Sequence, residues 1–217
     1  MLIIFDWDGT VSDSTAKIVR CVQSAAKDMA LPALAPQVIK EIIGLSLVNA
    51  MAQLYPQLGA TEIEVLAAAY SRHYVADDEI PGFYEGALEA LEQLHDEGFS
   101  LAIATGKSRK GLDRVLAQLG VASLFSFSRC ADETASKPDP LMLNEILAVS
   151  NRCHSRAVMV GDTEFDMAMA KAIAMPRVAV SYGAHHIDRL KAYEPKLCVD
   201  NLTLMLPWLC QQREMLG

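Results

Sequence analysis

The sequence lacks the features of several large functional classes. No apolar run approaches the roughly 18 residues of a membrane span, and no Lys/Arg cluster relieves a formal charge of −8 that repels nucleic acid and acidic membrane surfaces. The five cysteines are widely spaced, with no CxxC pair, so we expect reduced thiols. The first acids follow a short apolar run with no basic segment before it. We therefore expect the cytoplasm, and neither a membrane nor nucleic acid as a partner.

The composition is that of an ordinary globular protein. Apolar residues make up 52% of the 217 positions and charged residues 21%, with no low-complexity segment or internal repeat. A chain of this length can bury roughly 70% of the surface that it would expose when unfolded. One domain, or a core with an insertion, is therefore expected.

Five short apolar segments have the pattern of strands buried on both faces of a parallel sheet. They are residues 2–5, 100–106, 124–130, 157–162 and 177–183. Amphipathic helical patterns that end at a glycine lie between some of them, as in 85–98 and 112–120. This alternation predicts an α/β fold with a doubly wound, Rossmann-like parallel sheet.

Residues 14–82 interrupt the alternation. They contain helical patterns and proline or glycine punctuation, but no convincing strand. We therefore predict two parts, an α/β core of residues 1–13 and 83–217 and an all-helical insertion of residues 14–82. The insertion begins beside the first acidic motif and ends in a hinge-like segment at 77–83, so it should stand over the strand ends as a lid.

Two aspartates end the first apolar run. Asp6 and Asp8 are two residues apart, so at the end of a strand both should face the same crevice. Two desolvated carboxylates that repel each other are costly unless a cation or a proton resolves the conflict. A solvated Asp-turn is the simpler alternative for this motif alone, and the other motifs must decide between the two.

Four polar motifs lie at or just after predicted strand ends or helix entries. In chain order they are FDWDGTVSDS with Asp6 and Asp8, ATGKS with Thr105, SKPDP with Lys137, and VGDTEFD with Asp162 and Asp166. Their composition, order and separation resemble the four signatures of the haloacid dehalogenase-like (HAD) superfamily, over nearly the whole chain. The resemblance implies a HAD core with an inserted helical cap domain at residues 14–82.

The resemblance also implies a mechanism and a metal. Asp6 would be the nucleophile that forms an aspartyl-phosphate, and Asp8 would act as general acid and then general base. Mg²⁺ would be bound by Asp6, the backbone carbonyl of Asp8 and Asp162, with Asp166 supporting or joining the metal shell.

The remaining positions would hold the phosphoryl group. Thr105 would donate its hydroxyl hydrogen, the Gly106 amide would assist, and Lys137 would bring a positive charge to the phosphoryl oxygens and the nucleophile. Gly9 would let the chain turn sharply, so that backbone N–H groups can approach the phosphate.

Asp8 and the insertion indicate which activity to expect. Members of the superfamily that act as dehalogenases or phosphonate hydrolases lack an acid at this position, so the resemblance implies phosphate ester or anhydride hydrolysis. IIGLSL at 42–47 also resembles the cap segment of phosphoglycolate phosphatase-like members. We therefore predict a Mg²⁺-dependent phosphatase acting on a small phosphorylated metabolite, either phosphoglycolate-like or a sugar phosphate. The alternatives are a β-phosphoglucomutase-type mutase, an inorganic pyrophosphatase, or a non-catalytic binding module. The sequence does not indicate an oligomeric state.

Three other interpretations are weaker. The GKS of ATGKS resembles the end of a P-loop, but Leu101 stands where the first glycine is required, and no strand is followed by GxGxxG. His185 and His186 have no accompanying acid or cysteine at metal-ligand spacing, which favours a polar helix entry over zinc. The cations at 107–110 are expected on a solvated face, with attraction of substrate as the alternative.

Overall fold

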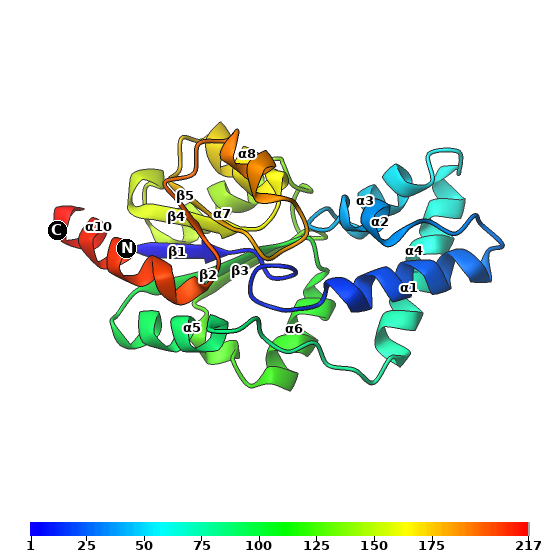
Figure 1. Cartoon of the computed structure of the whole chain (residues 1–217), viewed down its shortest axis with the longest axis horizontal. Coiled ribbons are helices and arrows are strands. Elements are labelled where there is room, and N and C mark those ends of the chain that lie inside the picture. The colour runs from blue at the N-terminus through cyan, green and yellow to red at the C-terminus, as the bar shows by residue number, and fades with distance from the viewer. Residues whose placement is uncertain (217) are drawn as a thin grey trace.

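The computed structural model describes residues 1–216 and is built around one parallel sheet (Figure 1). Its six strands lie in the order β3-β2-β1-β4-β5-β6. Their bounds are β1 Leu2–Phe5, β2 Ser100–Thr105, β3 Phe127–Cys130, β4 Ala157–Gly161, β5 Arg177–Val180 and β6 Leu197–Val199. The predicted doubly wound α/β fold is confirmed.

The first strand is the centre of the sheet. β1 pairs in parallel with β2 on one side and with β4 on the other. Its alternate residues enter separate apolar clusters, with Ile3 and Phe5 in one and Leu2 and Ile4 in the other. The direction of winding reverses beside this strand, and the carboxyl ends of strands at such a reversal form the usual ligand crevice of a doubly wound sheet.

Helices cover both faces of the sheet (Figure 1). The cluster containing Ile3 and Phe5 also takes residues from three helices, α5 Ala87–Asp96, α6 Arg109–Leu119 and α10 Leu206–Leu216. The opposite cluster takes residues from α7 Leu141–Ser150 and α8 Glu164–Ala172. The short helix α9 Ile187–Lys191 packs beside β5. The remaining helical turns are short 3₁₀ segments at 122–124, 154–156 and 202–205.

The other helices form a separate cluster beyond the carboxyl ends of the strands (Figure 1). They are α1 Thr15–Asp28, α2 Pro36–Lys40, α3 Leu47–Leu54 and α4 Ala60–Ala76, and they enclose an apolar cluster of their own. Here they are called the helical part, residues 14–82. No strand lies in this segment of the described chain, as the sequence pattern predicts.

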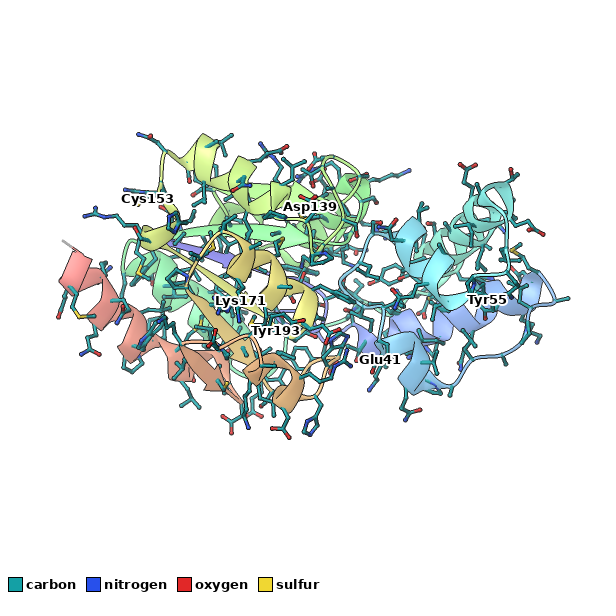
Figure 2. The ribbon with its side chains drawn as sticks, turned by 90° about the horizontal axis from the view of Figure 1, so that it is seen from above. Glu41, Tyr55, Asp139, Cys153, Lys171 and Tyr193 are labelled. Atoms are coloured by element: carbon teal, nitrogen blue, oxygen red, sulfur yellow. The ribbon has the colours of Figure 1, made fainter. Side chains whose placement is uncertain are left out.

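The two parts meet at a narrow junction and at several further contacts. Ser12 and Phe83 form an isolated antiparallel bridge where the chain leaves and re-enters the core. Farther along, the Glu41 carboxylate of the helical part pairs with the Arg189 guanidinium of α9. Figure 2 shows Glu41 on the side of the helical part that faces the core, and Tyr55 at its far end.

The strand predictions need three corrections. β6 was not predicted, because it has only three residues and two of them are partly or fully exposed, so it carries no buried apolar run. The segment predicted from 124 starts at Phe127, since residues 122–124 form a 3₁₀ turn. The segment predicted to reach 183 ends at Val180. Within the part of the chain that the structure describes, no helix has the length and apolar character needed to cross a membrane.

The loop after β2 touches the helical part too closely for a side chain. A Cβ atom on Gly106 would lie 2.6 Å from the Gly44 carbonyl oxygen and closer still to that of Leu45. Because both atoms belong to the backbone, they cannot rotate away, and overpacking of this kind costs about 1–3 kcal/mol.

Gly106→Ala should therefore lower Tm by several degrees, at about 2–4 °C per kcal/mol for a chain of this size. Gly82→Ala is the control, because a Cβ atom there meets nothing within 4 Å. Differential scanning calorimetry of both variants tests this contact. Equal Tm values for the two variants would show that the approach of the helical part to Gly106 does not contribute to stability.

Candidate functional site

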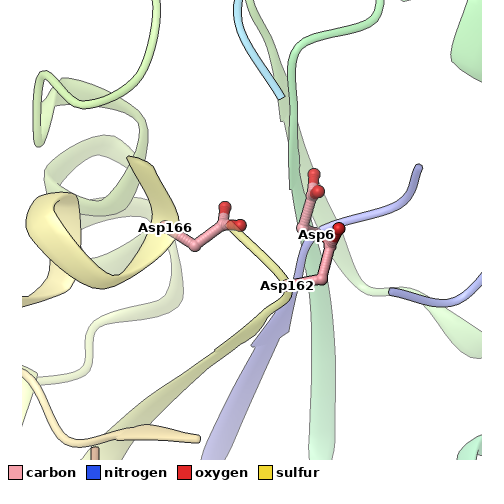
Figure 3. A group of neighbouring side chains, drawn as sticks. All are labelled: Asp6, Asp162 and Asp166. Atoms are coloured by element: carbon pink, nitrogen blue, oxygen red, sulfur yellow. The ribbon is translucent and has the colours of Figure 1, made fainter. Parts of the chain in front are cut away.

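Acidic side chains meet at the carboxyl edge of the sheet. Asp6 follows β1 and Asp162 follows the adjacent strand β4, while Asp166 lies in the first turn of α8. Figure 3 shows the three carboxylates turned toward one another, and each offers an oxygen within 4.8 Å of the others. All three residues are buried. The strand order therefore brings together two motifs that are more than 150 residues apart in the chain.

Lys137 joins two of these carboxylates. Its Nζ atom donates to Asp6 Oδ1 at 2.6 Å and to Asp166 Oδ1 at 2.7 Å, and its side chain is fully buried. Burial alone would lower the pKa of Lys137, but the carboxylates of Asp166 and Asp6 raise it overall. The ammonium group therefore stays charged and neutralises part of the buried negative charge.

Asp166 is held by its own helix as well as by Lys137. Thr163 caps the start of α8. The backbone N–H and the hydroxyl of Thr163 both donate to Asp166 Oδ2, at 3.1 Å and 2.7 Å. Oδ1 is occupied by Lys137. Asp166 therefore holds Lys137 in place, and its carboxylate also lies within reach of a cation shared with Asp6 and Asp162.

Asp162 is fixed by two donors and two close glycines. Its Oδ1 atom accepts from the Thr10 hydroxyl at 2.7 Å, and its Oδ2 atom accepts from the Ala184 amide at 2.7 Å. A Cβ atom on Gly9 would lie 2.8 Å from the Asp162 carboxyl carbon, and one on Gly183 would overlap the same side chain. Gly9 also has a φ of +90°, which glycine adopts at low cost.

Asp6 contains the one buried side-chain oxygen that has no hydrogen-bond partner within residues 1–216, its Oδ2 atom. Burial raises the pKa of Asp6, Lys137 offsets part of that rise, and Asp166 and Asp162 add to it. Burial and the neighbouring Asp166 likewise raise the pKa of Asp162 to about 7. Three acids with one lysine leave an excess of negative charge.

This excess fits a hard divalent cation. Carboxylate oxygens are the ligands that Mg²⁺ and Ca²⁺ prefer, and each of the three acids offers one within 4.8 Å of the others. A bound cation would lower the repulsion that raises the pKa values of Asp6 and Asp162. Asp6 and Asp162 are the best-placed ligands, with Asp166 within reach.

Asp8, like Asp6, lies in the loop that follows β1, but its side chain contacts different residues. Its Oδ1 atom accepts from the Ser14 hydroxyl at 2.5 Å and pairs with Lys107 Nζ at 2.9 Å. Lys107 Nζ also lies 3.3 Å from the Tyr74 hydroxyl of α4. Thr105, the last residue of β2, is buried, and its hydroxyl oxygen accepts from the Lys107 amide at 3.2 Å. Gly106 follows at once, at the contact with the helical part.

The expectation of a solvated face at 107–110 is wrong for Lys107. Its side chain is only 11% exposed, because it lies between Asp8 and Tyr74. Lys110 is exposed, and Arg109 pairs with Glu133 on the core. The sequence offered one signal for the role of Lys107, its place two residues after Thr105 in a predicted site loop.

Several supporting residues were not predicted from the sequence. The acids of the site accept hydrogen bonds from the hydroxyls of Thr10, Ser14 and Thr163 and from the Ala184 amide. The three hydroxyls belong to the motifs but had no predicted role, and Ala184 lies outside the motifs. His185 is buried, and its Nδ1 atom accepts from the Glu164 amide, which is a structural role. His186 caps α9, in agreement with the helix entry predicted there.

Comparison with known proteins gives a consistent family. A family model described as "Haloacid dehalogenase-like hydrolase" matches residues 3–180. "Probable phosphatase IndB" of Dickeya dadantii is 35% identical over 93% of this chain and 90% of that protein. A "Phosphoglycolate phosphatase" of Aliivibrio fischeri is 29% identical over 98% of this chain and 97% of that protein.

Solved structures show the same fold. The crystal structure of a hydrolase from Pseudomonas syringae superimposes with a TM-score of 0.86, covering 96% of this chain and 97% of that one at 23% identity. At this identity the likeness shows the fold alone.

The buried acids predict how stability depends on pH and on a cation. A carboxyl group whose folded pKa is raised stabilises the fold below its unfolded pKa, and this stability is lost as the pH rises through the folded value. For Asp162 that loss begins near the usual aspartate pKa of about 4 and levels off a little above pH 7. The metal-free protein should therefore have a Tm several degrees lower at about pH 8 than at about pH 6.

Excess Mg²⁺ should raise Tm more at the higher pH, because protons compete with the ion for the same carboxylates. Asp162→Asn should reduce both effects, while Asp96→Asn, at a position with an 85% exposed side chain, should leave them unchanged. Thermal melts with Mg²⁺ and with chelator measure this. A Mg²⁺ response that is equal at both pH values, or that survives Asp162→Asn, would contradict the assignment.

Proposed function

We propose that this chain, which belongs to the haloacid dehalogenase-like hydrolase family, is a Mg²⁺-dependent phosphatase that hydrolyses a small phosphate monoester through an aspartyl-phosphate on Asp6. The observation that carries the proposal is the free, buried Oδ2 atom of Asp6, whose other oxygen is held by Lys137. Relatives named as phosphatases, matched over nearly their whole length, support the same reaction class.

The cation would be bound by Asp6, Asp162 and the backbone carbonyl of Asp8, with Asp166 close by. It would supply positive charge to the phosphoryl oxygens, which repel the carboxylates of the site. The remaining charge comes from the chain itself. Lys137 uses two of its three Nζ hydrogens on Asp6 and Asp166, so one is left for a phosphoryl oxygen.

Hydrolysis divides into two displacements. Asp6 Oδ2 attacks phosphorus and forms an O–P bond, while the ester oxygen leaves with a proton from Asp8. Asp8 then takes a proton from water, whose oxygen attacks the aspartyl-phosphate. Inorganic phosphate is released and the Asp6 carboxylate is regenerated. The Thr105 hydroxyl and the Gly106 amide would hold the phosphoryl oxygens during both steps.

Asp8 must change partners during this sequence. Its carboxylate now pairs with Lys107 and Ser14, so it faces the helical part. Residues 14–82 would act as a cap domain over a core of residues 1–13 and 83–217, opening at the Ser12–Phe83 junction and at 77–83 to admit substrate. Because Ser14 lies at the start of the helical part, movement of the cap would make or break its hydrogen bond to Asp8.

The rival functions differ in their products. A mutase would convert a sugar phosphate into its isomer without net release of phosphate, a pyrophosphatase would accept only the anhydride, and a binding module would release nothing. A panel of phosphoglycolate, pyrophosphate, sugar phosphates and nucleotides, with Mg²⁺ and with chelator, separates them by their product.

Asp6→Asn should lower phosphate release by about 10³-fold or more, because an amide oxygen cannot serve as the nucleophile. The fold should persist, since the substitution removes a buried charge and keeps the side-chain shape. Phosphate release and Tm are measured together, with Asp96→Asn as the exposed control. Release by Asp6→Asn at the rate of the parent protein would refute the mechanism.

Asp8→Asn should separate the two steps. For alkyl phosphates, whose leaving oxygen needs a proton, turnover should fall by about 10²–10⁴-fold. For 4-nitrophenyl phosphate, which leaves without protonation, rapid mixing should show a burst of one nitrophenolate per site before a slow phase. The burst indicates an aspartyl-phosphate that water no longer attacks efficiently. Loss of the burst together with turnover would contradict the role given to Asp8.

A further inference from the structure

A cavity of about 290 Å³ lies between the core and the helical part and reaches Asp8. Asp8, Gly106 and Lys107 form part of its core-side wall. This volume lies just below the roughly 300–1,000 Å³ of pockets that hold small organic ligands. The cavity is therefore the space into which the alcohol part of an ester would extend from the proposed phosphoryl site.

The two walls of this cavity differ in chemistry. The wall formed by the helical part is largely aliphatic, with Ile18, Val22, Ile42, Ile43, Leu47 and Met51. Its polar groups are few and belong to Ser71 and to two tyrosines, Tyr70 and Tyr74, whose rings lie 5.7 Å apart. The core-side wall carries the cations Lys107, Lys110 and Arg114.

The three cations lie on one side of the cavity and differ in their contacts. Lys107 is already engaged by Asp8 and Tyr74. Arg114 stacks over the Tyr74 ring at 5.8 Å from its centre. Lys110 is exposed, where its charge can attract a phosphate dianion toward the entrance. The wall opposite these cations, formed by the helical part, offers mainly apolar and aromatic contact.

We propose that the substrate is a phosphate monoester of an apolar alcohol with the bulk of a ring or a medium alkyl chain. This inference rests on the proposed phosphatase activity and specifies its substrate class. Against the aliphatic wall, the hydroxyls of a sugar or the carboxylate of glycolate would lose water without gaining hydrogen bonds. An apolar leaving group would bury its surface against Ile43, Leu47 and Met51 at no such cost.

A homologous series of esters tests the inference. Ethyl, butyl, hexyl and 2-phenylethyl phosphates have leaving alcohols of similar basicity, so differences in kcat/KM report binding in the cavity. We expect kcat/KM to rise about three- to fourfold per added methylene, and 2-phenylethyl phosphate to exceed phosphoglycolate by about 100-fold. A flat or falling series, or phosphoglycolate as the best substrate, would overturn the inference and leave the phosphatase proposal intact.

Two leucine variants locate the effect. Leu47 and Leu58 are both partly buried residues packed on the apolar cluster of the helical part, but only Leu47 lines the cavity. Leu47→Ala should lower kcat/KM for hexyl phosphate by about tenfold and that for ethyl phosphate by about twofold at most. Leu58→Ala should change both esters alike. Equal effects of the two variants on the hexyl-to-ethyl ratio would contradict a role for this cavity.

A binding measurement keeps the inference testable if no ester, including 4-nitrophenyl phosphate, is hydrolysed with Mg²⁺. That result would refute the phosphatase proposal alone. Hexylphosphonate should still raise Tm more than methylphosphonate does in the presence of Mg²⁺, and Leu47→Ala should remove the difference. Equal shifts for the two phosphonates would refute the apolar cavity as a ligand site.

Discussion

The site depends on the hydrogen bonds of one buried lysine. Lys137 donates to Asp6 and to Asp166. Thr163 holds Asp166, Asp166 fixes the position of Lys137, and Lys137 in turn orients Asp6 through one carboxylate oxygen. Three buried carboxylates without this lysine would repel one another in a medium of low dielectric constant. With it, the charge excess is reduced but not removed, and Asp6 Oδ2 stays free of any hydrogen bond in the described chain.

The backbone around the site is shaped to leave room for these acids. Gly9 and Gly183 approach Asp162 where no side chain would fit, and Gly161 likewise approaches Asp166. The threonine cap of α8 uses the first turn of a helix to hold an acid, which the helix dipole also stabilises. The residues of these loops therefore fix the positions of the carboxylates before any ligand enters.

In the proposed reaction, the two parts of the chain would divide the recognition of an ester between them. The core would hold the phosphoryl group with its acids, Lys137 and the Thr105 hydroxyl, whatever the rest of the substrate. The helical part contributes most of the apolar wall beyond Asp8. Lys107 lies where the two meet, since it pairs with Asp8 of the core and Tyr74 of α4.

The sequence by itself determined the parallel sheet and named the acids that gather at its edge. Both features are encoded locally in the chain. A buried strand appears as a run of apolar residues, and the polar site residue comes directly after that run, as Asp6 does after Phe5. β6 was not predicted, because two residues of this three-residue edge strand are partly or fully exposed and it has no such run. The pairing of Lys107 with Asp8 and the apolar wall formed by residues such as Leu47 were decided only by tertiary structure. They depend on how the helical part packs over the strand ends, and that packing joins residues whose separation in the chain carries no local signal.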